Sequence, residues 1–259
     1  MNFISRLSLN IYAYLQEKLD PNLFKKIGNS NLGRPIRNLF LRKNNLPRIV
    51  GDQVYFENLD FYFQASIKTV STAKRKGLEA RITRVAMTQL TSGSIGVDVG
   101  ANYGFITLAM AKSVMPNGKI ISFEPAPHIK EVLLDNIKKN NLEENCIIID
   151  RFAGSKNLDR FVTVDQVLSS YGIDKIDFIK IDVDGGDYAV LLGAQDILSR
   201  CLPPVVIEMH DNQEEIFNYL KDLGYLHFMG MSGEDVIIPN YPPNLFASVF
   251  PLHIPTQGS

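Results

Sequence analysis

Apolar runs and amphipathic stretches alternate along most of the chain. The short apolar runs predict strands at Ile95–Val99, Lys119–Phe123, Cys146–Asp150, Ile176–Ile181, Val205–Glu208, Tyr225–Phe228 and Leu245–Phe250. The stretches of helical period between them predict helices at Gly104–Ser113, His128–Asn140, Tyr188–Leu198 and Gln213–Leu223. Strands that read as continuous apolar runs are buried on both faces. The alternation therefore predicts an α/β fold with a doubly wound sheet.

Two further patterns precede the first strand of that sheet. The segments Val54–Phe56 and Leu59–Phe63 are rich in aromatic and β-branched residues, which favours a hairpin of short strands. Apolar residues then recur at helical spacing from Leu78 to Leu90, and Gly93 ends the run. A hairpin and a helix are thus expected to lead into the main domain.

The first 50 residues differ in composition from the rest. Met1–Leu19 is amphipathic, but polar residues interrupt it too often for a signal peptide or a membrane span. Pro21–Gly51 contains seven Lys and Arg residues and no Asp or Glu, which is typical of a solvated linker or of a surface for an acidic partner. We expect a helical and basic extension over residues 1–50, a domain over residues 51–259, and a homodimer through the extension.

Composition restricts the classes of partner. The chain has 259 residues, 45% of them hydrophobic, and a formal net charge of −1. This size allows one substantial core, and the charge balance predicts neither a nucleic-acid nor a membrane partner. The two cysteines, Cys146 and Cys201, are too few for a disulfide framework. Without an export signal, a cytoplasmic location is expected.

The turn after the first predicted strand carries the main chemical signal, because ligands of such folds bind beyond the carboxyl ends of the strands. It reads Asp98-Val99-Gly100-Ala101-Asn102-Tyr103-Gly104. Gly100 allows the backbone to approach a ligand closely, and Gly104 allows close packing where the helix begins. The Asp98 carboxylate would repel the pyrophosphate that a G-x-G-x-x-G turn binds. It suits the cationic amino-acid end of S-adenosylmethionine.

Glu124 adds a second signal, since it ends the next predicted strand just before Pro125. A carboxylate at this position accepts hydrogen bonds from two ribose hydroxyls, which predicts an adenosine cofactor. The alternative is that Glu124 interacts only with the dipole of the following helix. A nicotinamide oxidoreductase is a third possibility, but its G-x-G-x-x-G turn is missing here.

Several ordered motifs resemble the FkbM-type S-adenosylmethionine-dependent methyltransferases from about Gly77 to Phe250. They are the turn from Val97 to Gly104, Phe123–Pro127 followed by Asn136 and Asn140, Val164-Asp165, Ile179–Gly185, and Ile207–His210. The resemblance implies a class I, Rossmann-like sheet of seven strands, S-adenosylmethionine as methyl donor, and usually a hydroxyl oxygen as acceptor. The family usually has Glu at positions 184 and 187, where this chain has Asp184 and Asp187.

Methyl transfer requires the acceptor oxygen to be held against the methyl group and to lose its proton. Asp182 follows the fourth strand of the sheet and is expected to contact the cofactor or the acceptor. His210 follows the fifth strand and is our candidate general base, although a histidine there can also be a structural hydrogen-bonding group. Phe152 and Ala153 are expected to border the adenine, and Tyr103 and Glu79 to line the pocket.

Two alternatives remain open at this stage. Asp182, Glu208 and Asp211 offer hard oxygen ligands that could hold a divalent metal, although a metal-free reaction is favoured. A catalytically inactive cofactor-binding or scaffold protein would have the same fold. For an active enzyme, the expected acceptor is a small molecule, a natural product or a sugar or glycan.

Overall fold

The chain divides into two units, and a computed structural model describes most of the larger one. The described residues are 53–66, 69, 78–231, 233, 236 and 238–252. The larger unit comprises Gln53–Gln64 and Thr72–Ser259, and the smaller comprises Met1–Asp52 and Ala65–Ser71. The predicted extension over residues 1–50 lies outside the described residues, so its helix, its basic segment and the homodimer stay predictions.

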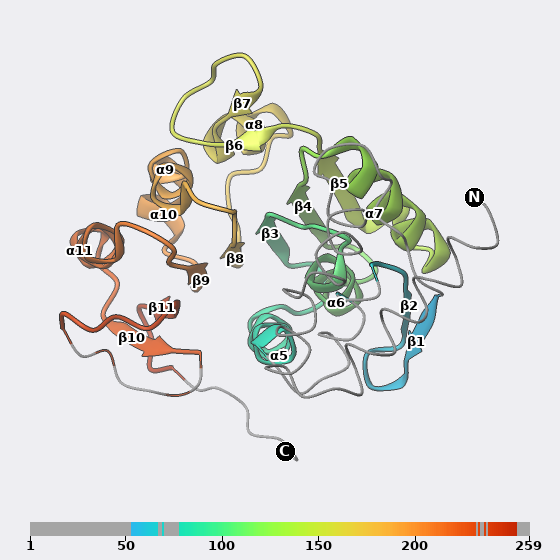
Figure 1. The fold of residues 1–259 in the computed structure, drawn as a ribbon, viewed down its shortest axis with the longest axis horizontal. Helices are drawn as coiled ribbons and strands as arrows, with labels where there is room; N and C mark the ends of the chain where they lie inside the picture. The colour runs from blue at the N-terminus through green and yellow to red at the C-terminus, as the bar shows by residue number, and fades with distance from the viewer. Residues whose placement is uncertain are drawn as a thin grey trace, which may run out of the picture. The chain divides into compact units, whose positions relative to one another are not determined.

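A sheet of seven strands forms the centre of the larger unit (Figure 1). Its order is β10 (His227–Gly230), β11 (Asn244–Ser248), β9 (Val205–Glu208), β8 (Phe178–Ile181), β3 (Ile95–Val99), β4 (Lys119–Phe123) and β5 (Cys146–Ile149). The last five of these are parallel, whereas β11 is antiparallel to both of its neighbours. The chain runs outward from β3 to β5 and returns at β8, so the strand order reverses between β3 and β8. The predicted doubly wound sheet is confirmed.

Helices cover both faces of the sheet (Figure 1). One face carries α5 (Leu78–Gln89), α6 (Phe105–Val114) and α7 (Pro127–Lys139), and the other carries α8 (Val164–Ser170), α9 (Asp187–Leu192), α10 (Gln195–Cys201) and α11 (Gln213–Leu223). Strand side chains alternate between these faces. Among the described residues, no helix is long and apolar enough to cross a bilayer.

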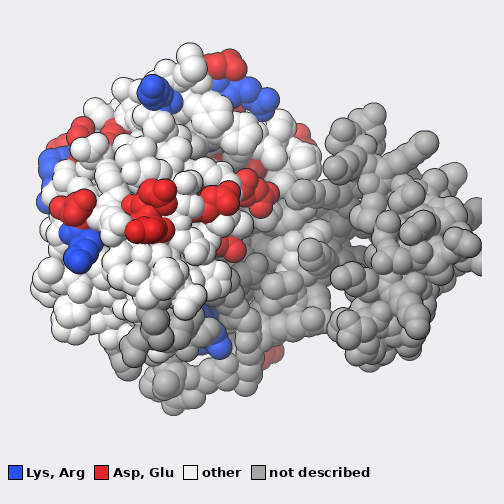
Figure 2. All heavy atoms as spheres, turned by 60° about the vertical axis from the view of Figure 1, so that its left-hand side comes forward, with Lys and Arg blue, Asp and Glu red and all other residues white. Residues whose placement is uncertain are grey.

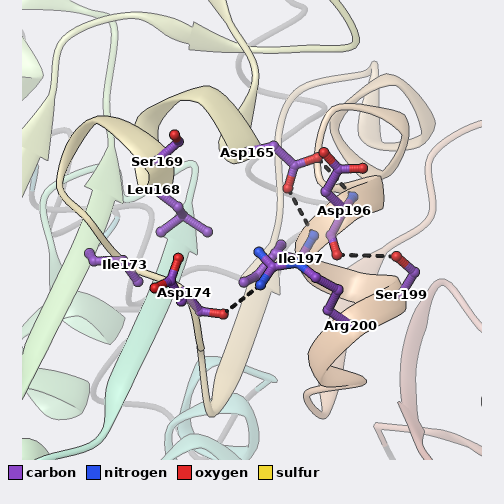
Figure 3. Close-up of a pocket in the computed structure, with 9 residues that line it drawn as sticks. All are labelled: Asp165, Leu168, Ser169, Ile173, Asp174, Asp196, Ile197, Ser199 and Arg200. Carbon is purple, nitrogen blue, oxygen red and sulfur yellow. Dashed lines mark hydrogen bonds between the residues drawn. The ribbon is translucent and has the colours of Figure 1, made fainter.

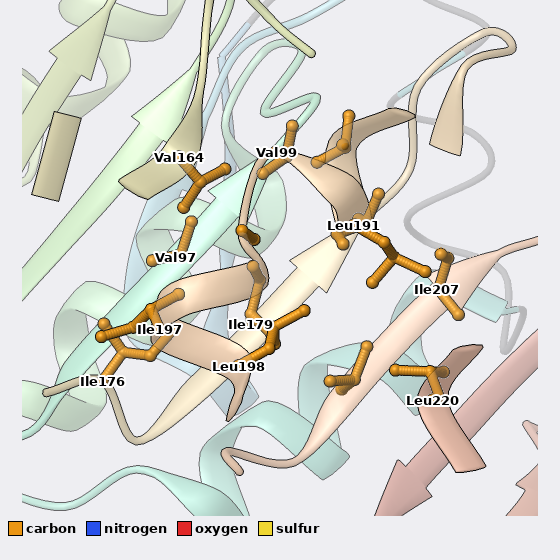
Figure 4. Close-up of a cluster of buried hydrophobic side chains, with 14 of the residues drawn as sticks. Val97, Val99, Val164, Ile176, Ile179, Leu191, Ile197, Leu198, Ile207 and Leu220 are labelled. Carbon is orange, nitrogen blue, oxygen red and sulfur yellow. The ribbon is translucent and has the colours of Figure 1, made fainter. Parts of the chain in front are cut away.

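The core between the sheet and the second group of helices is built from branched aliphatic side chains. Strands contribute Val97, Val99, Ile179 and Ile207, and helices contribute Val164, Leu191, Ile197, Leu198 and Leu220 (Figure 4). Burial of these apolar side chains stabilises the fold by roughly 1.5–3 kcal/mol each. This core fixes the positions of the strand ends that carry the candidate site.

The predicted hairpin packs on the first group of helices. Strands β1 (Val54–Phe56) and β2 (Phe61–Phe63) pair antiparallel around a 3₁₀ turn, η1 (Glu57–Leu59). The ring of Phe105, at the start of α6, meets three hairpin rings edge-on at centroid distances of 5.0–5.4 Å, those of Phe56, Phe61 and Phe63. The hairpin therefore covers the helix that follows the glycine turn.

Two asparagine side chains, one in α7 and one at its C-terminal end, bond the backbone of the hairpin strand β2 and the residue after it. Asn140 bonds both the amide and the carbonyl of Tyr62, and Asn136 does the same at Gln64. Asn136 also donates to the carbonyl of Tyr103 at 2.8 Å. One buried amide thus ties the hairpin to the candidate site.

Some predicted elements differ from the observed ones. The predicted helix Tyr188–Leu198 is two helices, α9 and α10, which are separated at Gly193 and Ala194. Gly193 lies against the backbone of Gly154, where a Cβ atom would sit 1.9 Å from the carbonyl oxygen. The last two strands are displaced by one or two residues from the predicted ranges. The structure adds α8, the 3₁₀ turn η2 (Glu143–Asn145), and the short strand pair β6 (Phe152–Ala153) and β7 (Phe161–Val162), which the sequence pattern missed.

Candidate active site

The turn between β3 and α6 lies at the reversal of strand order, where the sequence placed the cofactor. The amides of Gly100 and Ala101 both donate to the carbonyl of Phe123, at 3.1 and 3.0 Å, so the turn folds over the end of β4. Asn102 has a φ of 52° and is exposed. The turn thus presents its middle to solvent at the carboxyl edge of the sheet.

The Glu124 carboxylate organises this edge. Its Oε2 atom accepts from the amide of Asn102 at 2.9 Å, and its Oε1 atom accepts from the amide of Ala126 at 2.8 Å. Burial raises the pKa of Glu124, and these two hydrogen bonds oppose that rise. Each oxygen retains one lone pair for a hydroxyl donor. The carboxylate can therefore still accept hydrogen bonds from hydroxyl groups, and the ribose contact stays a prediction.

Asp98, the predicted partner of the cationic end of the cofactor, lies inside the sheet. It is 0% exposed. Its Oδ2 atom accepts from the Thr107 hydroxyl at 2.6 Å, and its Oδ1 atom lies 3.1 Å from the Nζ atom of Lys180. Lys180 is the cross-strand neighbour of Asp98 and forms an ion pair with it, and the contact of Asp98 with the cofactor stays a prediction.

The packing of the backbone also requires a glycine at position 100, whereas its predicted approach to a ligand stays a prediction. Its φ is 81°, and a Cβ atom there would lie 1.8 Å from the Asp182 carbonyl oxygen. The close neighbour is therefore the backbone after β8. At Gly104 the prediction is confirmed, because a Cβ atom would meet the Leu133 side chain of α7 at 2.3 Å.

Asp182 and Glu208 meet where β8 and β9 end. Their carboxyl groups are hydrogen-bonded, and this bond, with burial, raises the pKa of Glu208 to about 7. Burial alone would raise the pKa of Asp182, but Lys180 and the bond with Glu208 outweigh it and lower that pKa. The two carboxyl groups therefore titrate as one unit near neutrality, and Glu208 is the member that is more readily protonated.

His210 lies beside this pair. Its Nε2 atom is 3.6 Å from Oε2 of Glu208, and its Nδ1 atom is 3.3 Å from Oδ2 of Asp187. Burial is the largest single influence on the pKa of His210 and lowers it, but the bond to Asp187 and the nearby carboxylates together outweigh burial, so the net shift is upward. Asp187 is buried, which raises its pKa, and its other oxygen accepts from the amide of Val183 at 3.1 Å. The structure thus brings together His210, Asp182 and two further carboxylates.

The other predicted contact residues are spread around this edge. Ala101 and Tyr103 are buried, and the Tyr103 hydroxyl has no partner among the described residues. Tyr103 therefore packs inward rather than lining an open pocket. Pro125 and Ala153 are half-buried, and the ring of Phe152 is exposed 5.4 Å from that of Phe161. The side chain of Glu79 lies outside the description.

The described residues do not form the set of metal ligands that the alternative mechanism requires. In the described part of the chain, no group of three or more His, Cys, Asp or Glu side chains is placed to hold an ion. Asp182 and Glu208 are together, but Asp211 is exposed and contributes no contact to them. The predicted trio of metal ligands therefore does not form.

A cavity of about 350 Å³ lies elsewhere, between α8 and α10 (Figure 3). Asp165 accepts from the amides of Asp196 and Ile197 there, and Arg200 donates to the carbonyl of Asp174. Its lining comes from the two helices and the loop before β8. It shares no residue with the candidate site.

Two residues of the site were missed by the sequence analysis. Lys180 interrupts the apolar strand Ile179–Ile181, and a lysine inside a buried strand is a signal that a counter-charge lies beside it. Asp187 was noted only as a departure from the family pattern. Its contact with His210 could not be foreseen, because it depends on how α9 begins after the Gly185-Gly186 turn.

Comparisons with known proteins agree with this geometry. Residues 160–226 match the family model described as the methyltransferase FkbM domain. The methyltransferase sdnD of Sordaria araneosa is 26% identical over 195 residues, covering 52% of this chain and 75% of that protein. The AMB antimetabolite synthetase AmbE of Pseudomonas aeruginosa is 33% identical over 79 residues, covering 30% of this chain. The chain spans 4% of AmbE, a small part of that relative.

A solved structure shares the fold. The putative rRNA-methylase of Clostridium thermocellum aligns with a TM-score of 0.50 at 12% identity, covering 66% of this chain and 94% of that one. Strand order and alignment define the fold of a class I methyltransferase. Within that class, the match over residues 160–226 and the relative sdnD confirm the resemblance of this chain to the FkbM-type methyltransferases.

Proposed function

We propose that this chain transfers the methyl group of S-adenosylmethionine to a hydroxyl oxygen of a small molecule, a natural product or a sugar or glycan. The observation that carries the proposal is the convergence of two kinds of group at the reversal of strand order. One kind is a turn and carboxylate suited to an adenosine cofactor, around Gly100 and Glu124. The other kind is a set of proton-accepting side chains, around His210.

The cofactor half of the proposal rests on shape and charge. Glu124 is fixed by two backbone amides, which leaves its remaining lone pairs for ribose hydroxyls. Of the two aspartates near the turn, Asp182 is 42% exposed and Asp98 is buried. S-adenosylmethionine carries a net positive charge, so an exposed carboxylate beside the turn favours it over a phosphate-bearing cofactor.

The proposal of a hydroxyl acceptor rests on a side chain that can remove the hydroxyl proton. A hydroxyl group is a poor nucleophile until its proton is accepted. His210 has one ring nitrogen at Asp187 and the other at Glu208, and its side chain is 39% exposed. This arrangement supports a general base with an orienting carboxylate behind it, the logic used by activated hydroxyl nucleophiles in other enzymes. Sequence similarity to part of AmbE, an antimetabolite synthetase, supports a natural-product acceptor.

Surface charge supports a neutral or cationic acceptor rather than a polyanion. On the face that Figure 2 shows, Asp and Glu side chains gather in the middle, and Lys and Arg side chains stand at the margins. The formal net charge of −1 points the same way. A nucleic-acid acceptor is therefore disfavoured. The cytoplasmic location stays a prediction.

Calorimetric titration tests the cofactor. We expect binding of S-adenosylmethionine and S-adenosylhomocysteine and no binding of nicotinamide cofactors. Absence of binding by the methionine-derived pair would contradict the proposal. Transfer of label from methyl-tritiated S-adenosylmethionine to pools of hydroxyl, amine and carboxyl compounds then identifies the acceptor class. The second candidate, an inactive cofactor-binding scaffold, predicts binding without transfer to any pool.

A further inference from the structure

Lys180 occupies an unusual position for a charged residue. It lies in the middle of β8, between two buried isoleucines, and is 3% exposed. Its cross-strand neighbours are Asp98 on β3 and Val206 on β9. An ammonium group is costly to bury unless it is paired and hydrogen-bonded. The contacts of Lys180 therefore need a reason beyond packing.

Those contacts join both sides of the candidate cofactor site. The Nζ atom donates to the carbonyl of Gly100 at 2.9 Å and lies 3.3 Å from that of Val99. It also lies 3.1 Å from Oδ1 of Asp98 and 3.6 Å from Oδ2 of Asp182. One ammonium group thus touches the turn after β3 and the first residue after β8.

The same contacts decide which carboxylate acts on a ligand. Asp98 and Lys180 are both buried and form a pair without net charge. Asp182 keeps its charge and is partly exposed. Of the two aspartates that share Lys180, Asp182 is therefore the one whose charge is more weakly paired and open to a ligand.

We propose that Lys180 is a positioning residue for the cofactor: it holds the Gly100 turn against the end of β8 and leaves Asp182 as the carboxylate that faces the methionine end. This inference rests on the proposed use of S-adenosylmethionine. The predicted importance of Asp98 then has an indirect cause, because Asp98 keeps the ammonium in place.

The test compares cofactor affinity with stability. Lys180→Met alone leaves Asp98 as a buried, unpaired charge, and such variants often fail to fold. The double variant Asp98→Asn/Lys180→Met removes both charges, and apolar replacement of a complete buried pair is often tolerated. The pair has no net charge, but Lys180 also lowers the pKa of Asp182, so affinity is measured at pH 7 and at pH 9, where the Asp182 carboxylate is ionised in both proteins. A loss of affinity in a folded double variant that persists at pH 9 therefore reports lost positioning.

Thr107→Val is the matched control, since it removes the other partner of Asp98 and leaves every contact of Lys180 intact. Calorimetry with S-adenosylhomocysteine should show at least a tenfold weaker Kd for the double variant and an unchanged Kd for the control, although both lower the Tm. A smaller than tenfold change in a folded double variant that binds would overturn the inference and leave the proposed function standing. Absence of binding by the unmodified chain would overturn the proposed function itself.

If the methionine variant does not fold, Asp98→Asn/Lys180→Gln is judged by the same criterion. The two amides can bond to each other, and glutamine is one atom shorter than lysine, so it cannot keep the contacts with the turn and Asp182 together.

Discussion

The Nδ1 atom of His210 lies 3.3 Å from Oδ2 of Asp187, a buried carboxylate whose other oxygen is held by the amide of Val183. In the neutral imidazole the carboxylate therefore favours a proton on Nδ1, so Nε2, which lies 3.6 Å from Oε2 of Glu208, is the nitrogen that can accept a proton.

Substitution Asp187→Asn should lower turnover about 100-fold or more without weakening the binding of S-adenosylmethionine. The amide can still accept from Val183, but it offers an N–H to Nδ1 and so favours the tautomer whose Nε2 is already protonated. Turnover is measured by methyl transfer to the identified acceptor, and binding by calorimetry. Asp184→Asn is the control, because Asp184 is an exposed neighbour. Equal turnover in both variants would remove Asp187 from the mechanism.

The rate of methyl transfer should rise with pH along a limb that lies above the ordinary pKa of histidine. A general base acts only when deprotonated, and the pKa of His210 is raised from 6.5. His210→Ala should keep cofactor binding, lower turnover, and lose or displace this limb. Because Glu208 titrates in the same pH range beside His210, the apparent pKa of this limb describes both side chains rather than His210 alone. An unchanged profile in His210→Ala would assign the base elsewhere.

Glu208 makes stability depend on pH independently of any acceptor. Its pKa rises from 4.5 to about 7 on folding, so the folded state holds the proton more tightly than the unfolded state. Its contribution to stability is fully present below pH 4.5, falls as the pH rises through 7, and stays low above that. Glu208→Gln, which mimics the protonated form, should therefore raise the Tm more at pH 8 than at pH 5. An equal gain in Tm at pH 5 and pH 8 would contradict the raised pKa of Glu208.

Alanine substitutions at Gly100 and Gly185 distinguish the cost of backbone strain from the cost of a steric clash. Gly100 and Gly185 have φ angles of 81° and 89°, but a Cβ atom would meet the Asp182 carbonyl at 1.8 Å in the first and nothing within 4 Å in the second. Gly185→Ala should cost about 1–2 kcal/mol, from the left-handed backbone alone. Gly100→Ala should cost clearly more and also abolish cofactor binding. Comparable Tm values for the two variants would mean that the turn can move away from β8.

Much of the sheet was predictable because its parallel strands are buried on both faces. Ile95–Val99, Lys119–Phe123 and Val205–Glu208 have the predicted bounds, since their apolar runs have clear ends. The ends of β10 and β11 were displaced because pairing, rather than apolar content, decides where antiparallel edge strands stop. Helix α8 was missed, although Thr163 caps it through the amide of Gln166, because seven residues are too few to show a helical period.

The site was predictable in part for a similar reason. The position of Asp98, Glu124, Asp182 and His210 at strand ends follows from the order of elements. Their partners do not, because register between β3 and β8 pairs Asp98 with Lys180 across 82 positions of sequence. The charge argument based on Asp98 did not include Lys180, because only the pairing of the strands reveals the neighbouring ammonium.

The two hydrogen bonds of Glu124 have a kinetic consequence. The amides of Asn102 and Ala126 are occupied by the carboxylate whether or not a cofactor is present. The rotamer of Glu124 is therefore selected during folding, and an arriving ribose meets a rigid acceptor. Cofactor association at this edge should then be limited by diffusion and desolvation rather than by a search among side-chain conformations.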